Sequence, residues 1–251
     1  MFTDYINSII AKLEHFSPFA YLFAFLKKRI DLNKSSGLTL TVLLFVFGYA
    51  ALSFISTSAM NDYTLNIDYA FSNLLYTFRH PLTVKVFIWI TFLGDAHVVA
   101  PLALGVCVLF WILKKRKYII PFAASLATSF FALTFLKEIW ARPRPSGLLP
   151  VFFADSWSFP SGHAAMSITL YGFLIYFFWK IFKKWNHKIN AAFVGLLLIL
   201  AVGFSRIYLG VHYLSDVWAG YMVGVMILSV SIGWLEWKEK SAPEKPAQPI
   251  R

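Results

Sequence analysis

The chain has 251 residues, of which 59% are apolar, 19% are aromatic and only 14% are charged. Soluble domains carry about 25% charged and about 45–50% apolar residues, and disordered chains need low hydrophobicity. The composition therefore excludes both classes and indicates a membrane protein. A single cysteine, Cys107, excludes a disulfide framework and a multi-cysteine metal site. The net charge of +11 fits nucleic-acid binding or membrane orientation, and the positions of the charges decide between them.

The N-terminal segment, residues 1–37, is amphipathic and contains Pro18, so we expect no cleavable signal peptide but a piece on the cytoplasmic surface. A membrane-spanning helix needs about 20 largely apolar residues. Six stretches reach or approach this length and predict an all-α integral membrane bundle of six transmembrane helices over residues 38–235. The predicted spans are 38–58, 96–113, 118–136, 164–179, 189–204 and 213–235.

Two apolar segments between the first two predicted spans are expected to lie in the outer membrane interface. Between Phe71 and Phe78, apolar residues recur at the spacing of one helix face, which predicts an interfacial helix. Residues 81–93 are also apolar, but they contain Lys85 and are too short to span alone. We therefore predict a second interfacial piece there.

Lys and Arg are distributed unevenly over the predicted loops. Most of the 23 basic residues precede the first span, separate the second from the third and the fourth from the fifth, or follow the sixth. Cytoplasmic loops collect Lys and Arg, so both termini are predicted to be cytoplasmic. Residues 236–251, rich in proline and charge, are expected to form a disordered cytoplasmic tail. The net charge then reports orientation, and no nucleic-acid partner is expected.

The few charges of the outer side are concentrated in three segments at the ends of spans. The first segment, residues 137–145, follows the third span and contains Lys137, Arg142 and Arg144. A proline follows each of the two arginines. A guanidinium can bind two phosphate oxygens together, and a lysine adds a point charge. Taken alone, these side chains also fit an interfacial anchor at the end of a span.

The second segment, residues 160–163, opens the fourth span. Free N–H groups and the positive end of the helix dipole make a helix N-terminus an anion site. Ser161 can cap the helix or donate its hydroxyl to phosphate, and Gly162 lets the backbone approach a ligand closely. His163 follows in the first turn. Plain N-capping with an interfacial histidine is the alternative interpretation.

The third segment, residues 205–216, links the fifth and sixth spans. His212 and Asp216 are four residues apart, a spacing that puts them on one helical face. A carboxylate on one imidazole nitrogen fixes the tautomer and leaves the other nitrogen free to attack. Arg206, upstream across a short turn at Gly210, can supply a third cation. For this segment alone, a structural His–Asp pair is the alternative.

Together, the three segments place several ionisable groups at one bilayer face, where such groups are costly and by default indicate function. The chain resembles the type-2 phosphatidate phosphatase (lipid phosphate phosphatase) superfamily, whose three-part signature matches Lys137-x6-Arg144-Pro145, Pro160-Ser161-Gly162-His163 and Ser205-Arg206-x5-His212-x3-Asp216. Vanadium haloperoxidases share a similar signature, but six predicted spans argue against that family.

The resemblance implies a role for each matching residue. His212 would be the nucleophile and form a phosphohistidine, Asp216 would orient it, and His163 would protonate the leaving oxygen. The phosphoryl oxygens would be held by Lys137, Arg144, Ser161, Gly162 and Arg206. The family uses no metal, and the outer face has no carboxylate cluster suited to Mg²⁺, so no metal or other cofactor is expected.

Three outer residues remain outside the signature. The spacing of Arg142 from Lys137 does not fit, which leaves the role of Arg142 open. Asp95 and His97, near the outer end of the second span, either line the entrance to the site or are merely interfacial, and we favour the interfacial interpretation.

A site at the headgroup level of the outer leaflet predicts a lipid phosphate substrate, with membrane lipids as neighbours and no obligatory protein partner. Undecaprenyl diphosphate is the first choice for a bacterial plasma-membrane (inner-membrane) protein, and phosphatidylglycerophosphate, phosphatidate and lipid A phosphates also fit. Two other functions stay open. The phosphohistidine could pass its phosphoryl group to a second lipid, or the pocket could belong to a non-catalytic lipid binder or transporter.

Overall fold

The computed structural model describes residues 36–59, 61–145 and 156–241. The chain divides into two compact units, residues 1–40 and 41–251, and all described residues except 36–40 belong to the second unit. The N-terminal surface segment predicted for residues 1–37 lies outside the described residues except at its end. Residues 242–251 of the predicted tail also lie outside them.

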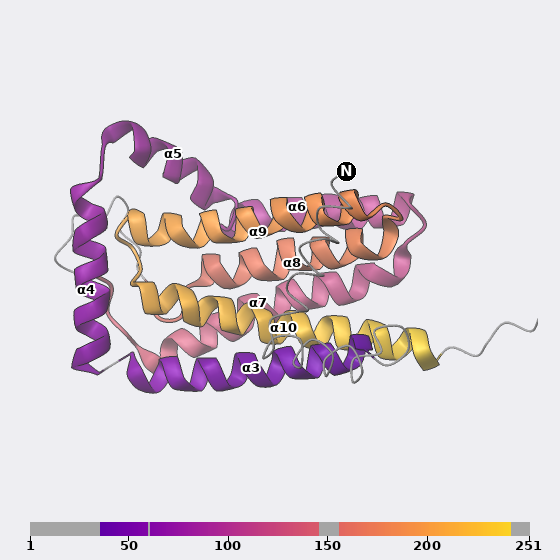
Figure 1. The fold of residues 1–251 in the computed structure, drawn as a ribbon, viewed down its shortest axis with the longest axis horizontal. Helices are drawn as coiled ribbons and strands as arrows, with labels where there is room; N and C mark the ends of the chain where they lie inside the picture. The colour runs from indigo at the N-terminus through magenta and orange to yellow at the C-terminus, as the bar shows by residue number, and fades with distance from the viewer. Residues whose placement is uncertain (1–35, 60, 146–155, 242–251) are drawn as a thin grey trace, which may run out of the picture. The chain divides into compact units, whose positions relative to one another are not determined.

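Helices make up the architecture, and the described residues contain no strand, which confirms the predicted all-α class (Figure 1). Short turns connect most of the helices, and helices that are not consecutive also pack on one another, such as α8 with α10 and α5 with α9. The elements are α3 (Ser36–Ser58), α4 (Asp62–Thr77), α5 (Pro81–Phe92), α6 (Ala96–Ile112), the 3₁₀ turn η1 (Arg116–Tyr118), α7 (Ile119–Trp140), α8 (Gly162–Ile181), α9 (Trp185–Tyr208) and α10 (Leu214–Ser241).

Five helices are long and apolar enough to cross a membrane, namely α3, α7 with η1, α8, α9 and α10. They match five of the six predicted spans. The last helix continues to Ser241, into the segment expected to be a disordered tail. The extension is held by ion pairs, because Glu236 lies 2.7 Å from Lys180 and Glu239 lies 2.7 Å from Lys117.

The second predicted span has a different form. Helix α6 has 17 residues, about 25 Å at 1.5 Å per residue, which is short of the roughly 30 Å hydrocarbon core. It qualifies as a span only together with α5, from which it is bent by 48°. Residues 81–93, expected as a separate interfacial piece, thus form α5 and lead directly into α6. Residues 91–95, which join the two helices, are called the elbow below.

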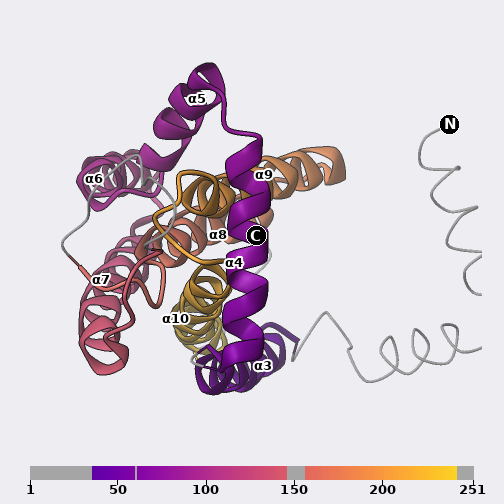
Figure 2. The same ribbon diagram turned by 90° about the vertical axis from the view of Figure 1, so that its left-hand side faces the viewer.

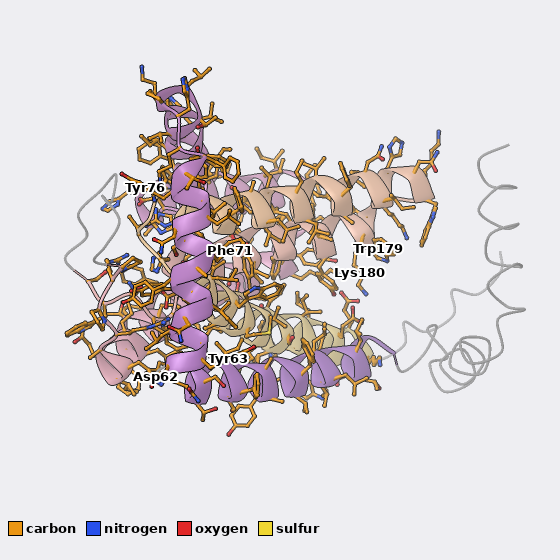
Figure 3. All side chains as sticks on the ribbon, turned by 60° about the vertical axis from the view of Figure 1, so that its left-hand side comes forward. Asp62, Tyr63, Phe71, Tyr76, Trp179 and Lys180 are labelled. Atoms are coloured by element: carbon orange, nitrogen blue, oxygen red, sulfur yellow. The ribbon has the colours of Figure 1, made fainter. Side chains whose placement is uncertain are left out.

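Helix α4 is the interfacial helix predicted from the spacing of apolar residues 71–78. It runs across the ends of α9 and α10 rather than along them (Figures 1 and 2). Phe71, labelled in Figure 3, and Leu75 pack on the hydrophobic core, while Leu74 and Phe78 are exposed. The buried face of α4 also carries Asp68, which is 1% exposed. A carboxylate in that position needs a buried partner.

Helix α8 is brought unusually close to α10 by two glycines of α10. A Cβ atom at Gly220 would collide with the carbonyl oxygen of Ser161, and one at Gly224 would lie 2.8 Å from the carbonyl oxygen of Ala165. Small residues four apart let membrane helices approach backbone to backbone. The N-terminus of α8 is therefore pressed against the first turns of α10.

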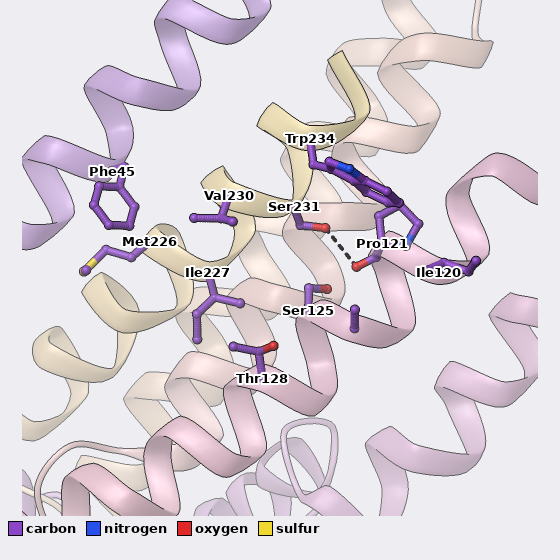
Figure 4. A pocket seen from close by; sticks show the side chains of 11 residues that line it. Phe45, Ile120, Pro121, Ser125, Thr128, Met226, Ile227, Val230, Ser231 and Trp234 are labelled. Atoms are coloured by element: carbon purple, nitrogen blue, oxygen red, sulfur yellow. Dashed lines mark hydrogen bonds between the residues drawn. The ribbon is translucent and has the colours of Figure 1, made fainter. Parts of the chain in front are cut away.

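An apolar pocket of about 440 Å³ opens between α3, α7 and α10 (Figure 4). Its wall includes Phe45, Met226 and Trp234, and it contains no charged side chain. Two of its lining residues are joined by a hydrogen bond of 2.8 Å from Ser231 Oγ to the carbonyl oxygen of Pro121. Ser231 lies about four turns of α10, roughly 22 Å, beyond Asp216. This pocket is thus separate from the polar residues that the sequence analysis singled out.

Candidate active site

The three polar segments singled out in the sequence meet at the end of the bundle that α4 crosses. The amide of Ser161 donates to the carbonyl oxygen of Asp216 at 2.9 Å, which ties the start of α8 to the start of α10. Arg144 donates to the carbonyl oxygen of Val211 at 2.6 Å, which ties the segment after α7 to the α9–α10 turn. Residues far apart in the sequence therefore form one site.

His212 and Asp216 form the expected pair. Nδ1 of His212 lies 3.4 Å from Oδ2 of Asp216, and both residues are buried, with exposed fractions of 1% and 0%. His212 lies just before α10, in a turn that Gly210 allows by adopting a φ of +74°. Asp216 lies in the first turn of α10 and accepts from the amide of Tyr213 at 2.9 Å. The second nitrogen of His212, Nε2, is thereby directed away from the carboxylate.

Ser158 supports this pair and was not singled out by the sequence analysis. Its hydroxyl donates to Oδ2 of Asp216 and lies 3.4 Å from Nδ1 of His212. Its amide donates to the carbonyl oxygen of Arg142 at 2.8 Å, which fixes its position. A lone serine just before the signature at 160–163 gave no pattern from which this contact could be predicted.

Arg144 and Lys137 are held by oxygen atoms of one short segment. Nε of Arg144 donates to the carbonyl oxygen of Ser156 at 2.8 Å, and Nζ of Lys137 donates to that of Trp157 at 2.8 Å. Arg144 also reaches His212, whose Nε2 lies 3.3 Å from its terminal nitrogen. Within the described ranges, neither cation forms an ion pair with a carboxylate. Their charges are positioned but not neutralised.

Two further predicted residues contain buried polar atoms without a partner among the described residues. Arg206 is 7% exposed, and one terminal nitrogen donates to Thr91 Oγ1 at 2.7 Å, but its Nε has no acceptor. Ser161 is fully buried, and its hydroxyl is also unpartnered. A buried unsatisfied polar group costs about 1–3 kcal/mol. Next to Ser161, the position that a Cβ of Gly162 would occupy borders open space.

The cations of the site affect the pKa of His212. Burial lowers the pKa of His212 well below the ordinary histidine value of 6.5, and the positive charges of Arg206 and Arg144 lower it further. The imidazole is therefore neutral and has a free electron pair at neutral pH. A neutral imidazole nitrogen beside unpaired cations is suited to attack an oxyanion centre such as phosphorus.

His163 lies in the first turn of α8, as expected, and its partner is Asp95. Nε2 of His163 lies 3.5 Å from Oδ2 of Asp95, and the two side chains are 19% and 28% exposed. The interpretation of Asp95 as merely interfacial therefore needs correction, because its carboxylate faces His163. His97, in contrast, has a side chain that is 95% exposed.

Arg142 is a buried structural cation, which settles the role that its spacing left open. It is 1% exposed, and its terminal nitrogens lie 2.6 Å from Asp216 and 2.8 Å from Asp68. Burial lowers its pKa, but the charges of Asp216 and Asp68 outweigh that effect and raise the pKa above its ordinary value. Arg142 thus fixes the carboxylate that supports His212.

Asp68 and Ser215 complete that arrangement and were missed in the sequence. The carboxylate of Asp68 accepts from the amide of Ser215 at 3.0 Å and from its hydroxyl at 2.5 Å. The signal for Asp68 was present, since it shares the helical face of Phe71 and Leu75 on α4. The described residues contain no cluster of three or more His, Cys, Asp or Glu side chains that could hold a metal ion.

Comparisons with known proteins agree with the fold and with the motifs. The PAP2 superfamily matches residues 118–240. The chain is 29% identical over 197 residues to phosphatidylglycerophosphatase B of Bacillus subtilis, covering 78% of this chain and 94% of that protein. It is 30% identical over 145 residues to the putative undecaprenyl-diphosphatase YbjG of Escherichia coli, covering 56% and 69% of the two chains.

A solved structure extends the likeness beyond the region matched by the family. The crystal structure of a transmembrane PAP2-type phosphatidylglycerolphosphate phosphatase from Bacillus subtilis superposes with a TM-score of 0.73 at 26% identity. The superposition covers 82% of this chain and 98% of that one. Sequence and fold therefore lead to the same assignment, and this chain is a member of the PAP2 superfamily.

Proposed function

We propose that this protein is a metal-independent lipid phosphatase that works through a phosphohistidine on His212. One observation carries the proposal, namely that Lys137, Arg144 and Arg206 lie around the His212–Asp216 pair and that none of them forms an ion pair with a carboxylate of the described residues. Such a set of fixed positive charges suits a phosphoryl group, whose negative charge they would offset in the transition state. The lipid phosphatase activities named for the relatives support the same reaction.

The first step forms the covalent intermediate. Asp216 holds the proton on Nδ1 of His212, so Nε2 presents its electron pair to phosphorus. As the N–P bond forms, the P–O bond to the lipid breaks, and its electron pair passes to the leaving oxygen. His163, in its charged form, gives that oxygen a proton.

The second step releases phosphate. The now neutral His163 takes a proton from a water molecule, whose oxygen attacks phosphorus. The N–P bond breaks, and its electron pair returns to Nε2 of His212. Throughout both steps, the phosphoryl oxygens are held by Lys137, Arg144, Ser161, Arg206 and the N–H group of Gly162.

The substrate is a lipid because the site lies at one end of a bundle of membrane-spanning helices. The tail can stay in the bilayer while the phosphate enters between α7, α8 and α10. We favour undecaprenyl diphosphate, since a putative undecaprenyl-diphosphatase is among the relatives. Phosphatidylglycerophosphate is the next candidate, because a phosphatidylglycerophosphatase B is also among the relatives. Phosphatidate and lipid A phosphates are further candidates.

We infer that the site lies on the outer side of the plasma (inner) membrane. Figure 3 shows Lys180 at the end of the bundle opposite α4. The basic run Lys114–Lys117 lies at that end as well, because Lys117 and Lys180 both pair with Glu239. Cytoplasmic loops are the ones enriched in Lys and Arg. Both termini are then cytoplasmic, and α4 with the site faces outward.

Phosphate release from purified protein tests the activity. In detergent micelles containing EDTA, we expect release of inorganic phosphate from undecaprenyl diphosphate without any added lipid acceptor. Phosphatidylglycerophosphate, phosphatidate, lipid A phosphate and a water-soluble phosphomonoester form the comparison panel. Activity that the chelator abolishes would contradict the metal-free mechanism. Transfer only to a second lipid would identify a phosphotransferase instead.

The pH dependence follows from the lowered pKa of His212. Burial and the charges of Arg206 and Arg144 keep the imidazole neutral as the pH falls below 6.5. Because attack needs the neutral form, the acidic limb of kcat/KM should lie below that value. Initial rates between about pH 4 and 9 measure it. An acidic midpoint at or above the ordinary histidine value of about 6.5 would contradict the proposed nucleophile.

A further inference from the structure

The elbow between α5 and α6 touches two of the candidate catalytic and binding residues. Thr91 Oγ1 accepts from Arg206 at 2.7 Å, and Asp95 Oδ2 lies 3.5 Å from His163 Nε2. Between them, a Cβ at Gly94 would lie 3.0 Å from the carbonyl oxygen of His163, so the elbow packs directly on the start of α8. The elbow precedes residues 118–240, the part that the PAP2 superfamily matches.

We propose that Asp95 is a positioning residue that orients His163 and favours the charged form from which His163 donates its proton. This inference rests on the proposed function, because it assigns a reason for the protonation of a residue that the mechanism uses. Asp95 touches neither the nucleophile nor the phosphate-binding cations, and it acts only through His163.

The carboxylate of Asp95 is fixed in orientation. It caps the N-terminus of α6, where Oδ1 accepts from the amide of His97 at 2.9 Å and lies 3.0 Å from that residue's Nδ1. Oδ2 is then directed to His163. With Nε2 of His163 paired to the carboxylate, Nδ1 is the nitrogen that delivers the proton to the leaving oxygen.

The charges around His163 explain why a carboxylate is needed there. Arg206 of α9 and Lys137 of α7 face the imidazole, and Asp95 of the elbow is the carboxylate that opposes them. His212 from the α9–α10 turn lies within electrostatic range as well. Cations that bind the phosphate would otherwise discourage the imidazolium that must protonate the leaving group.

The variant Asp95→Asn keeps the size and a capping oxygen but removes the charge. We expect kcat for a lipid monophosphate to fall about 10- to 100-fold, with KM nearly unchanged, as part of a general-acid contribution of 10²–10⁴-fold. The alkaline limb of the pH–rate profile should move to lower pH. A lipid diphosphate should lose less, because its phosphate leaving group needs the proton less than an alkoxide does.

A double-mutant cycle separates positioning from structure. If Asp95 acts through His163, Asp95→Asn should cause no further loss in a His163→Ala background. Asp62→Asn is the matched control, since it removes an exposed carboxylate from the start of α4 without touching the site. Asp95→Ser is the second variant, because serine retains the helix cap while lacking the charge.

Two results would overturn the role of Asp95. The first is a double variant whose loss of kcat equals the product of the two single losses. The second is an Asp95→Asn variant that loses equal activity on both substrates and keeps the alkaline limb of its pH–rate profile at the wild-type pH. Unfolding temperatures in detergent identify a variant that has lost its fold, and Asp95→Ser then decides the question. Failure of the proposed function looks different: wild-type protein would release no phosphate, or His212→Ala would remain active.

Discussion

Replacing His212 with alanine is expected to lower phosphate release by at least about 10⁴-fold, the scale on which enzymes lose activity when a nucleophile is removed. We do not expect His163 to take over the attack, because Asp95 favours the charged form of that imidazole, which has no free electron pair. The fold should survive, since Arg142 and Ser158 continue to bind Asp216 when the imidazole is gone. Phosphate release and the unfolding temperature in detergent are the two measurements.

The matched control is His187→Ala. His187 is exposed and lies in the first turn of α9, at the end of that helix far from Arg206, so its loss should leave phosphate release unchanged. A His212→Ala variant that keeps most of its activity would contradict the phosphohistidine. A lipid binder or transporter would behave in that way, because such a protein needs the pocket but not the nucleophile.

The spans show what a single sequence reveals about this fold. Helices α3, α7, α8, α9 and α10 are long, continuous apolar runs, so hydropathy alone predicts them. Helix α4 was predicted from its 3.6-residue spacing. The bent pair of α5 and α6 was not predicted as one unit, because residues 96–113 were expected to span alone and residues 81–93, which contain Lys85, were expected to form a separate interfacial piece. Tertiary packing of Phe87 on α9 stabilises α5, and a sequence does not show that contact.

The candidate site, like the membrane spans, was predicted only in part from the sequence. Residues such as Ser161 and His212 were predicted because they lie in short polar segments at the ends of apolar runs. Their supports were not, because each comes from a distant part of the chain. Asp68 bonds to Ser215 across 147 positions of sequence, and Asp95 reaches the start of α8 only through the 48° bend. Charge and spacing predict which residues are candidates for binding phosphate, but only the fold shows which side chains hold those candidates in position.

The same substitution should affect stability very differently at two arginines of one short segment. Arg142→Gln removes the partner of two buried carboxylates, Asp68 and Asp216. Loss of one member of a buried ion pair costs about 3–5 kcal/mol of unfolding free energy. The unfolding temperature should therefore fall markedly, and activity should fall with it because Asp216 loses its orientation.

Arg144→Gln should instead lower kcat by about 10²–10³-fold, the usual cost of removing a donor to a developing oxyanion. Its unfolding free energy should fall much less than that of Arg142→Gln, because the loss of Arg144 removes hydrogen bonds to carbonyl oxygens but leaves no buried carboxylate unpaired within the described part of the chain. Burial lowers the pKa of Arg144, which is consistent with a charge that the fold does not compensate.

A second-site change makes the contrast decisive. Adding Asp68→Asn to Arg142→Gln removes one of the two unpaired carboxylates, so the double variant should recover part of the lost unfolding temperature. The same Asp68→Asn change should give no recovery of activity to Arg144→Gln. Equal destabilisation by the two arginine variants, or no recovery in the double variant, would show that Arg142 does not hold α4 and Asp216 together. The expected difference between the two variants follows from the surroundings of each arginine. Arg142 is buried between two carboxylates and stabilises the fold, whereas Arg144 lies beside Nε2 of His212, where a substrate phosphate would bind.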